Sequence, residues 1–289
     1  MKPIPIHACN PGPYTGSGNW TWLICGRATT LVDAGTGEPQ FLEALERALD
    51  GAALTQVIVT HGHTDHASGA TALAARFSGV RFLKMPWPER DGRWPVPWEP
   101  ITDGATITAG DESLTAVHTP GHAPDHLCFW HGGSRTMFCG DLAQKGTTIY
   151  IPPNLQGDLV AYLNSLERVL ALQPARLLPA HGPVIDDPEP VLRGYLEHRR
   201  EREQQIVSLL REGASSPDEI VARLYRGLKE TLVPMARESV LAHLLKLERE
   251  GLVRRGAASA PSASAPKEDA AHTDHASARR EHAWLIIEP

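Results

Sequence analysis

The densest group of side chains that could do chemistry lies between residues 57 and 69, in VIVTHGHTDHASG. The apolar and β-branched residues 57–60 predict a short buried strand, and a helical run begins at Ala67. Three histidines and one aspartate follow this strand within six residues: His61, His63, Asp65 and His66. Neutral imidazole and carboxylate are ligands that Zn²⁺ and similar ions prefer. Such a density of ligand-type side chains predicts a metal site rather than a polar surface turn.

The same pattern of strand, tight turn and ligand-type residue returns later in the chain. His122 follows a Pro-Gly turn. Asp141 follows a strand predicted over 135–139, and His181 follows one predicted over 176–178. We expect these residues and the first group to lie at the same edge of stacked sheets. Asp33 also ends a strand, in DAGTG. Its carboxylate could orient a ligating histidine, or it could only shape the glycine-rich turn.

Alternating strands and helices must position these residues. Apolar spacing predicts helices at about 39–49, 67–77 and 158–172, and paired strands over 20–25 and 29–33. This order indicates sheets covered by helices. A loop rich in proline and tryptophan lies between the strand that starts at residue 80 and the next pair of predicted strands. Such a loop is either a functional rim or a segment that its tryptophans attach to the body. The tryptophans are Trp87, Trp94 and Trp98.

Composition narrows the class of protein. The chain has 289 residues, of which 42% are hydrophobic and 21% charged, as expected for one large domain or a large and a small one. Its net charge of −6 argues against non-specific binding of polyanions across the whole surface. No signal peptide or membrane span is predicted, and the four cysteines are scattered. We therefore expect a cytoplasmic protein with reduced thiols and no membrane partner.

Together these motifs resemble the metallo-β-lactamase superfamily. The matching segments are HxHxDH ending at His66, TPGH ending at His122, CGD ending at Asp141, and AHG with His181 at its centre. The resemblance covers residues 1–190 and implies an αβ/βα sandwich with two metal ions between its sheets. It implies three ligands for the first ion: His61, His63 and His122. It implies three for the second: Asp65, His66 and His181. Asp141 would bridge the two ions.

The chemistry that the resemblance implies is hydrolysis. Two divalent ions, expected to be Zn²⁺, would share a hydroxide that attacks a carbonyl or phosphorus centre. The catalytic carboxylates would be Asp65 and Asp141, with Asp33 orienting an imidazole. Two further residues are expected to bind substrate. Trp20 stands where the family more often has asparagine, and His126 could reach substrate or could instead be satisfied by the backbone.

The segment after His181 resembles the β-lactamase-like protein 2 branch, which in animals is a mitochondrial endoribonuclease of single-stranded RNA. The resemblance divides an α+β chain into a hydrolase domain over 1–195 and a small winged-helix domain over 196–289. Helices are expected over 197–212, from a cap at Ser216 to about residue 225, and over 234–250. The wing strands are expected at 252–255 and 283–288, with a low-complexity, disordered tip at about 256–282.

Three functions remain open from the sequence. The first is a metal-dependent phosphodiesterase that cleaves single-stranded RNA. The second is a thioesterase or lactonase of the glyoxalase II kind, which shares HxHxDH and acts on a small molecule. The third is a winged-helix nucleic-acid binder with a structural metal site, which the complete ligand set disfavours. The sequence leaves the oligomeric state open.

Overall fold

The computed structural model describes residues 1–258 and 282–287. Its contacts divide the chain into two compact units, Met1–His198 and Arg199–Pro289. The division falls inside the long helix α6 (Pro188–Arg211). None of the helices in the described part of the chain is long and apolar enough to cross a membrane.

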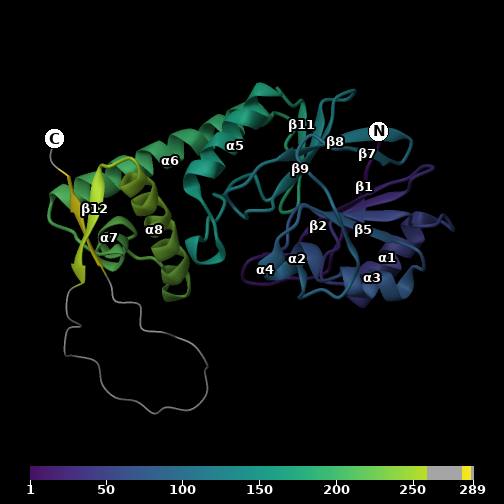
Figure 1. Cartoon of the computed structure of the whole chain (residues 1–289), viewed down its shortest axis with the longest axis horizontal. Coiled ribbons are helices and arrows are strands. Elements are labelled where there is room, and N and C mark those ends of the chain that lie inside the picture. Colours follow the sequence, from purple (N-terminus) through teal and green to yellow (C-terminus); the bar gives the residue numbers. More distant parts are fainter. Residues whose placement is uncertain (259–281, 288–289) are drawn as a thin grey trace, which may run out of the picture. The chain divides into compact units, whose positions relative to one another are not determined.

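The first unit is built on a pair of β-sheets (Figure 1). The six-stranded sheet contains β1 (Ile4–His7), β2 (Trp20–Ile24), β3 (Thr30–Val32), β4 (Gln56–Ile58), β5 (Arg81–Lys84) and β6 (Trp98–Pro100), in this order. The five-stranded sheet contains, in its own order, β11 (Arg176–Pro179), β10 (Thr136–Gly140), β9 (Leu127–His131), β8 (Glu112–His118) and β7 (Thr106–Ala109). Strands β3 to β6 pair in parallel, and so do β10 and β11. Ligand-type residues follow the parallel strands β4, β10 and β11, and one more, His122, follows the antiparallel strand β8.

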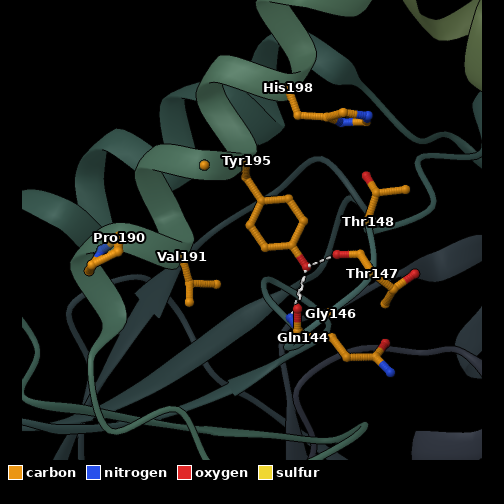
Figure 2. A pocket seen from close by; sticks show the side chains of 9 residues that line it. Gln144, Gly146, Thr147, Thr148, Pro190, Val191, Tyr195 and His198 are labelled. Carbon is orange, nitrogen blue, oxygen red and sulfur yellow. Dashed lines mark hydrogen bonds between the residues drawn. The ribbon is translucent and has the colours of Figure 1, made fainter.

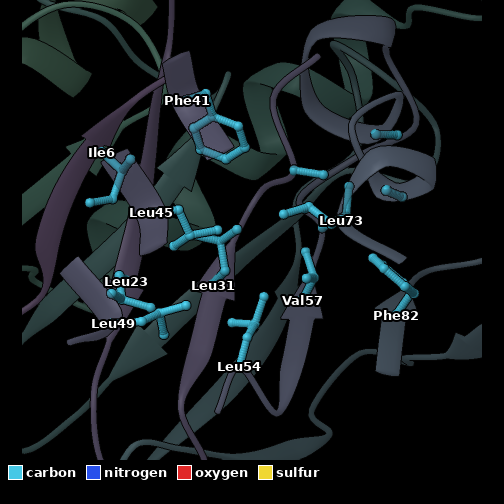
Figure 3. Packing of buried hydrophobic residues seen from close by; sticks show 14 residues of the cluster. Ile6, Leu23, Leu31, Phe41, Leu45, Leu49, Leu54, Val57, Leu73 and Phe82 are labelled. Atoms are coloured by element: carbon cyan, nitrogen blue, oxygen red, sulfur yellow. The ribbon is translucent and has the colours of Figure 1, made fainter. Parts of the chain in front are cut away.

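Helices α1 (Pro39–Leu49) and α3 (Ala70–Arg76) cover the outer face of the six-stranded sheet (Figure 1). Successive strand residues point to opposite faces, and the buried residues follow this period. Leu31 packs with α1 in an outer cluster, whereas its neighbour Val32 packs between the two sheets. Figure 3 shows the outer cluster, in which the apolar side of α1 meets the strands.

Helix α5 (Leu159–Ala171) supports the loop that joins β8 to β9. Its Tyr162 hydroxyl donates to the Leu142 carbonyl at 2.9 Å, and Ser165 donates to the Pro120 carbonyl at 2.8 Å. Gly121 is required here, because a Cβ atom at this position would lie 2.4 Å from Tyr162. The expected αβ/βα sandwich is thus confirmed, with a helix-covered sheet on either side of the shared core.

The structure differs from the sequence prediction after the ligand turn, the segment from His61 to His66 that follows β4. The single helix expected over 67–77 is two helices, α2 (Thr64–Ala67) and α3, separated at Gly69. A Cβ atom at Gly69 would lie 2.0 Å from the carbonyl oxygen of Ala34. Close approach of two backbones therefore overrides the helical periodicity.

Other elements were absent from the sequence prediction. The proline-rich loop contains a short helix, α4 (Pro88–Asp91), and strand β6. Strands β1 and β9 were also missed, β1 because its proline weakens the strand signal at a sheet edge. The single turn η1 (Pro153–Leu155) precedes α5.

The second unit is a small winged helix. It contains the end of α6, α7 (Pro217–Leu224), η2 (Glu230–Leu232), α8 (Val233–Arg249) and the paired strands β12 (Val253–Ala258) and β13 (His282–Ile286). Ser216 caps α7 through a capping box, as its sequence predicts. The helix expected to begin at residue 197 begins earlier, at Pro188. The disordered wing tip expected at about 256–282 lies outside the described residues except at its ends, which belong to β12 and β13.

Candidate metal centre

The structure brings the seven ligand-type side chains together, and three of the histidines form a first group. His61 and His63 follow β4, and His122 lies on the loop between β8 and β9. Nε2 of His61 lies 3.0 Å from Nδ1 of His63, which lies 2.9 Å from Nε2 of His122. Three imidazole nitrogens from two separate loops therefore converge on one point.

Asp65, His66 and His181 form a second group. The first two lie at the start of α2, and His181 follows β11. Oδ2 of Asp65 lies 3.3 Å from Nε2 of His66 and 3.3 Å from Nε2 of His181. This group again joins a local motif to a residue that is distant in the sequence.

Asp141 lies between the two groups. Its Oδ2 atom is 3.4 Å from Nε2 of His122 in the first group. Its Oδ1 atom is 3.5 Å from Nε2 of His66 and 3.3 Å from Nε2 of His181 in the second. One carboxylate oxygen therefore faces each group, as a shared ligand requires.

The donor set fits a pair of divalent ions. Two atoms bound to one tetrahedral Zn²⁺ at about 2.0–2.1 Å lie about 3.3 Å apart, close to the separations in the second group. Nε2 of His66 and Oδ1 of Asp141 are buried and have no hydrogen-bond partner. Such buried polar atoms are costly unless an ion or water satisfies them. The cluster of histidines and aspartates thus has the composition and spacing of a divalent-metal site.

The two groups differ in their electrostatics. Burial lowers the pKa of His61, His63 and His122, so these imidazoles are neutral and can act as ligands at neutral pH. In the second group, burial disfavours the protonated form of His66, but the neighbouring carboxylates outweigh it and raise the pKa of this imidazole. The imidazoles in turn lower the pKa of Asp141 despite its burial. The second group therefore has to lose protons when a cation binds.

Asp33 supports both groups from behind. It follows β3 in a left-handed backbone conformation with φ of 64° and is almost fully buried. Its carboxylate accepts hydrogen bonds from His66 Nδ1 at 2.9 Å and from the Thr60 hydroxyl at 2.9 Å. The Thr60 hydroxyl also lies 3.1 Å from His61 Nδ1. Asp33 is thus placed to orient imidazoles, as one of its two sequence interpretations expects.

His126 does not face substrate, and a backbone N–H satisfies its ring, as the second of its two sequence interpretations expects. It is fully buried between Thr119, whose hydroxyl lies 2.8 Å from its Nδ1, and Asp141. The backbone N–H of Asp141 donates to His126 Nε2 at 3.1 Å. Because the imidazole has no exposed surface, it holds the backbone of Asp141 in place instead of presenting an atom to substrate. Burial lowers the pKa of His126 to about 3, so its Nε2 remains an acceptor.

A buried lysine that sequence reasoning missed fixes the ligand turn. Lys84 is 1% exposed, and its Nζ lies 2.5 Å from Asp91 and 3.1 Å from Asp125. Asp125 accepts the backbone N–H of Gly62, the residue between two ligands, at 2.8 Å. The only signal of this contact in the sequence was that Asp125 lies next to His126. That neighbourhood does not identify Lys84 as the partner of the aspartate.

Trp20 and Asn19 lie at the start of β2, next to the second group. The Trp20 N–H donates to the carbonyl of Ala180, directly before a candidate ligand, at 2.7 Å. Its half-buried ring makes an edge contact with His7 at 4.9 Å. Asn19, which sequence reasoning missed, donates to the Asp65 carbonyl at 2.9 Å. Trp20 therefore lies close to the candidate metal centre, and its role in substrate binding stays a prediction.

The chain matches known families over both units. Residues 14–181 match the model of the metallo-beta-lactamase superfamily, and residues 216–260 match the beta-lactamase associated winged helix domain. It also resembles a crystal structure of a beta-lactamase domain protein from Burkholderia ambifaria, with a TM-score of 0.78 and 19% identity. That likeness covers 99% of this chain and 91% of the other.

Two curated relatives have informative names. The Beta-lactamase-like protein 2 homolog of Drosophila melanogaster is 32% identical over 268 residues, covering 87% of this chain and 89% of the relative. The Atrochrysone carboxyl ACP thioesterase of Aspergillus chevalieri is 29% identical over 256 residues, covering 84% and 79%. The name of the second relative states a thioesterase, whereas the name of the first states no substrate.

Proposed function

Because the chain belongs to the metallo-beta-lactamase superfamily, whose members are hydrolases, we propose that it hydrolyses phosphodiester bonds in single-stranded RNA. The observation that carries this proposal is the pair of ligand groups that share Asp141. When bound, two divalent ions, proposed to be Zn²⁺, supply a nucleophile from water at neutral pH and stabilise the charge on the transferred phosphorus group.

The residues of the chain prepare this site in three ways. His126 and Asp33 fix the directions of Asp141 and His66, which reduces the reorganisation needed during the reaction. The side chains of Asp65 and Asp141 remain 22% and 13% exposed, so water and substrate can reach their side of the cluster. We therefore assign Asp65 and Asp141 as the carboxylates that contact the reacting groups, and Asp33 as a positioning residue.

Two further features favour RNA over a small phosphodiester. The chain resembles the β-lactamase-like protein 2 branch over most of its length, including the winged helix. A cationic side chain, Arg90, also lies next to the first ligand group. Both features suit a substrate that carries several negative charges.

The test is cleavage of a labelled single-stranded RNA by the full-length, metal-loaded protein. We expect cleavage by the wild type, and none by His63→Ala or by protein stripped with a chelator. An equal rate of cleavage in the stripped protein would point to a contaminating nuclease and would refute the proposal. Circular dichroism of the variant would show whether its loss of cleavage reflects unfolding.

A thioesterase is the second candidate, and a pocket next to the cluster favours it. The pocket has a volume of about 480 Å³ (Figure 2), and it is lined by Gln144, Gly146, Thr147, Thr148, Pro190, Val191, Gly194, Tyr195 and His198. The segment from Asp141 to Tyr150 borders it and returns to the cluster, where the Tyr150 carbonyl lies 2.7 Å from His122 Nδ1. Figure 2 shows Val191 and the Tyr195 ring facing this space, which could take an acyl chain.

A substrate panel separates the two candidates. The same metal-loaded protein is incubated with single-stranded RNA and with S-lactoylglutathione, a thioester. Turnover of the thioester without any cleavage of RNA would replace the proposed function with the second candidate. Cleavage of RNA that is lost in His63→Ala supports the first.

A further inference from the structure

Arg90 in α4 lies at the edge of the first ligand group. Its Nη1 donates to the carbonyl of Gly62, the residue between two of the candidate ligands, at 3.2 Å. The guanidinium lies 5.0 Å from the centroid of the Trp87 ring. That ring in turn lies 5.9 Å from the imidazole of His63. The guanidinium is therefore held beside the candidate metal centre by a carbonyl and an aromatic face.

The positive charge of Arg90 has no carboxylate partner within 4.0 Å among the described residues. The two nearest carboxylates have other partners. Asp91 accepts from Lys84 at 2.5 Å and from the Trp87 N–H at 2.8 Å. Asp125 accepts from Gly62 and pairs with Lys84. Burial and the neighbouring Arg93 lower the pKa of Arg90, but a guanidinium remains protonated at neutral pH.

Helix α4, which carries Arg90, is fixed to the rest of the unit by a buried lysine. Lys84 reaches from β5 into α4 through its pair with Asp91 and donates to the Met85 carbonyl at 2.5 Å. The same ammonium pairs with Asp125, which anchors the ligand turn. Because one buried cation ties both segments together, the guanidinium has little freedom relative to the cluster. A fixed, partly buried cation that pairs directly with no carboxylate among the described residues is suited to bind an anion of a ligand.

We propose that Arg90 binds a backbone phosphate adjacent to the scissile one in a single-stranded RNA substrate. The planar guanidinium can form two parallel hydrogen bonds to phosphate oxygens. This inference rests on the proposed function for the identity of the substrate. Charge-assisted hydrogen bonds of this kind contribute enough that their loss weakens binding by about 10- to 100-fold.

The experiment measures binding of a short fluorescein-labelled RNA strand by anisotropy, together with kcat and KM for its cleavage. Arg90→Gln should weaken binding and raise KM by about 10- to 100-fold, with a smaller change in kcat. Arg90→Lys should restore part of the affinity, because it keeps the charge without the planar fork. Arg93→Gln is the matched control, since Arg93 is an exposed arginine of the same segment. It should change binding by less than about threefold.

A modified substrate identifies the contact itself. Strands are prepared with one uncharged methylphosphonate linkage next to the cleavage site. The substitution should weaken binding to the wild type by about the same factor as Arg90→Gln, and should have little further effect on that variant. An equal methylphosphonate effect in both proteins, equal effects of Arg90→Gln and Arg93→Gln, or no binding by the wild type would overturn the assignment. Binding that depends on Arg90 without cleavage would refute the proposed function and the position next to a scissile phosphate, and would leave only a contact between Arg90 and an RNA phosphate.

Discussion

Replacing Asp33 by asparagine tests whether a residue behind the ligands sets the metal affinity. Asparagine has nearly the same shape and tolerates the left-handed backbone found at this position, so the turn should persist. The carboxylate accepts from three donors: the Thr60 N–H at 2.7 Å, the Thr60 hydroxyl at 2.9 Å and His66 Nδ1 at 2.9 Å. An amide offers one acceptor oxygen, so at least one buried donor faces an NH₂ group.

The expected magnitude follows from these contacts. A buried donor without its acceptor costs about 1–3 kcal/mol, and loss of a residue that orients a ligand typically lowers metal affinity by about 10- to 100-fold. We therefore expect Asp33→Asn to raise the dissociation constant of the ion bound by the His66 group by about 10- to 100-fold. The ion bound by the three histidines should be affected less, because Asp33 reaches His61 only through Thr60.

The assay is a competition titration of metal-free protein with Zn²⁺ against a chromophoric chelator. Asp111→Asn is the matched control, since Asp111 is an exposed carboxylate that pairs with Arg27. Two dissociation constants within about twofold of the wild type in Asp33→Asn would show that this carboxylate does not orient the ligands.

Three further predictions concern the stability of the two units. Burial lowers the pKa of His243 to about 4, below its unfolded value, so its contribution to stability is present above pH 6.5 and is lost as the pH falls. Calorimetry should show that the stability lost between pH 7 and pH 5 is about 2 kcal/mol smaller in His243→Leu than in the wild type, and an unchanged pH slope in that variant would contradict this. Gly69→Ala should cost more than about 3 kcal/mol in urea unfolding because its Cβ would meet the Ala34 carbonyl, whereas Gly92→Ala, which meets no atom, should cost little. Ser216→Ala should cost about 1 kcal/mol by removing the cap of α7, and an unchanged melting temperature would show that the cap contributes nothing.

The candidate ligands could be predicted from the sequence because each stands directly after a strand, next to a turn. His61 to His66 lie within six residues, and the later ligands follow strands whose apolar runs are easy to detect. The sandwich followed from a resemblance that rested on these same motifs, and the winged helix from the resemblance of the segment after His181. The ends of β4, β8, β10 and β11 then bring the ligands together in space.

The supporting residues could not be predicted, because their partners are distant in the sequence. Lys84 joins Asp125 across 41 positions, and nothing local marks either residue as buried. The sequence left His126 as either a substrate contact or a ring satisfied by the backbone, because the direction of the ring, which decides between them, depends on tertiary packing. The break at Gly69 likewise depends on a second backbone segment.

The most direct test is anomalous diffraction from crystals of the full-length protein grown with Zn²⁺. We predict two metal peaks about 3.5–4 Å apart, one within the His61, His63 and His122 group and one within the Asp65, His66 and His181 group. Asp141 should contact both ions. A cluster that takes up no ion at saturating Zn²⁺, or binds a single ion away from Asp141, would contradict the account.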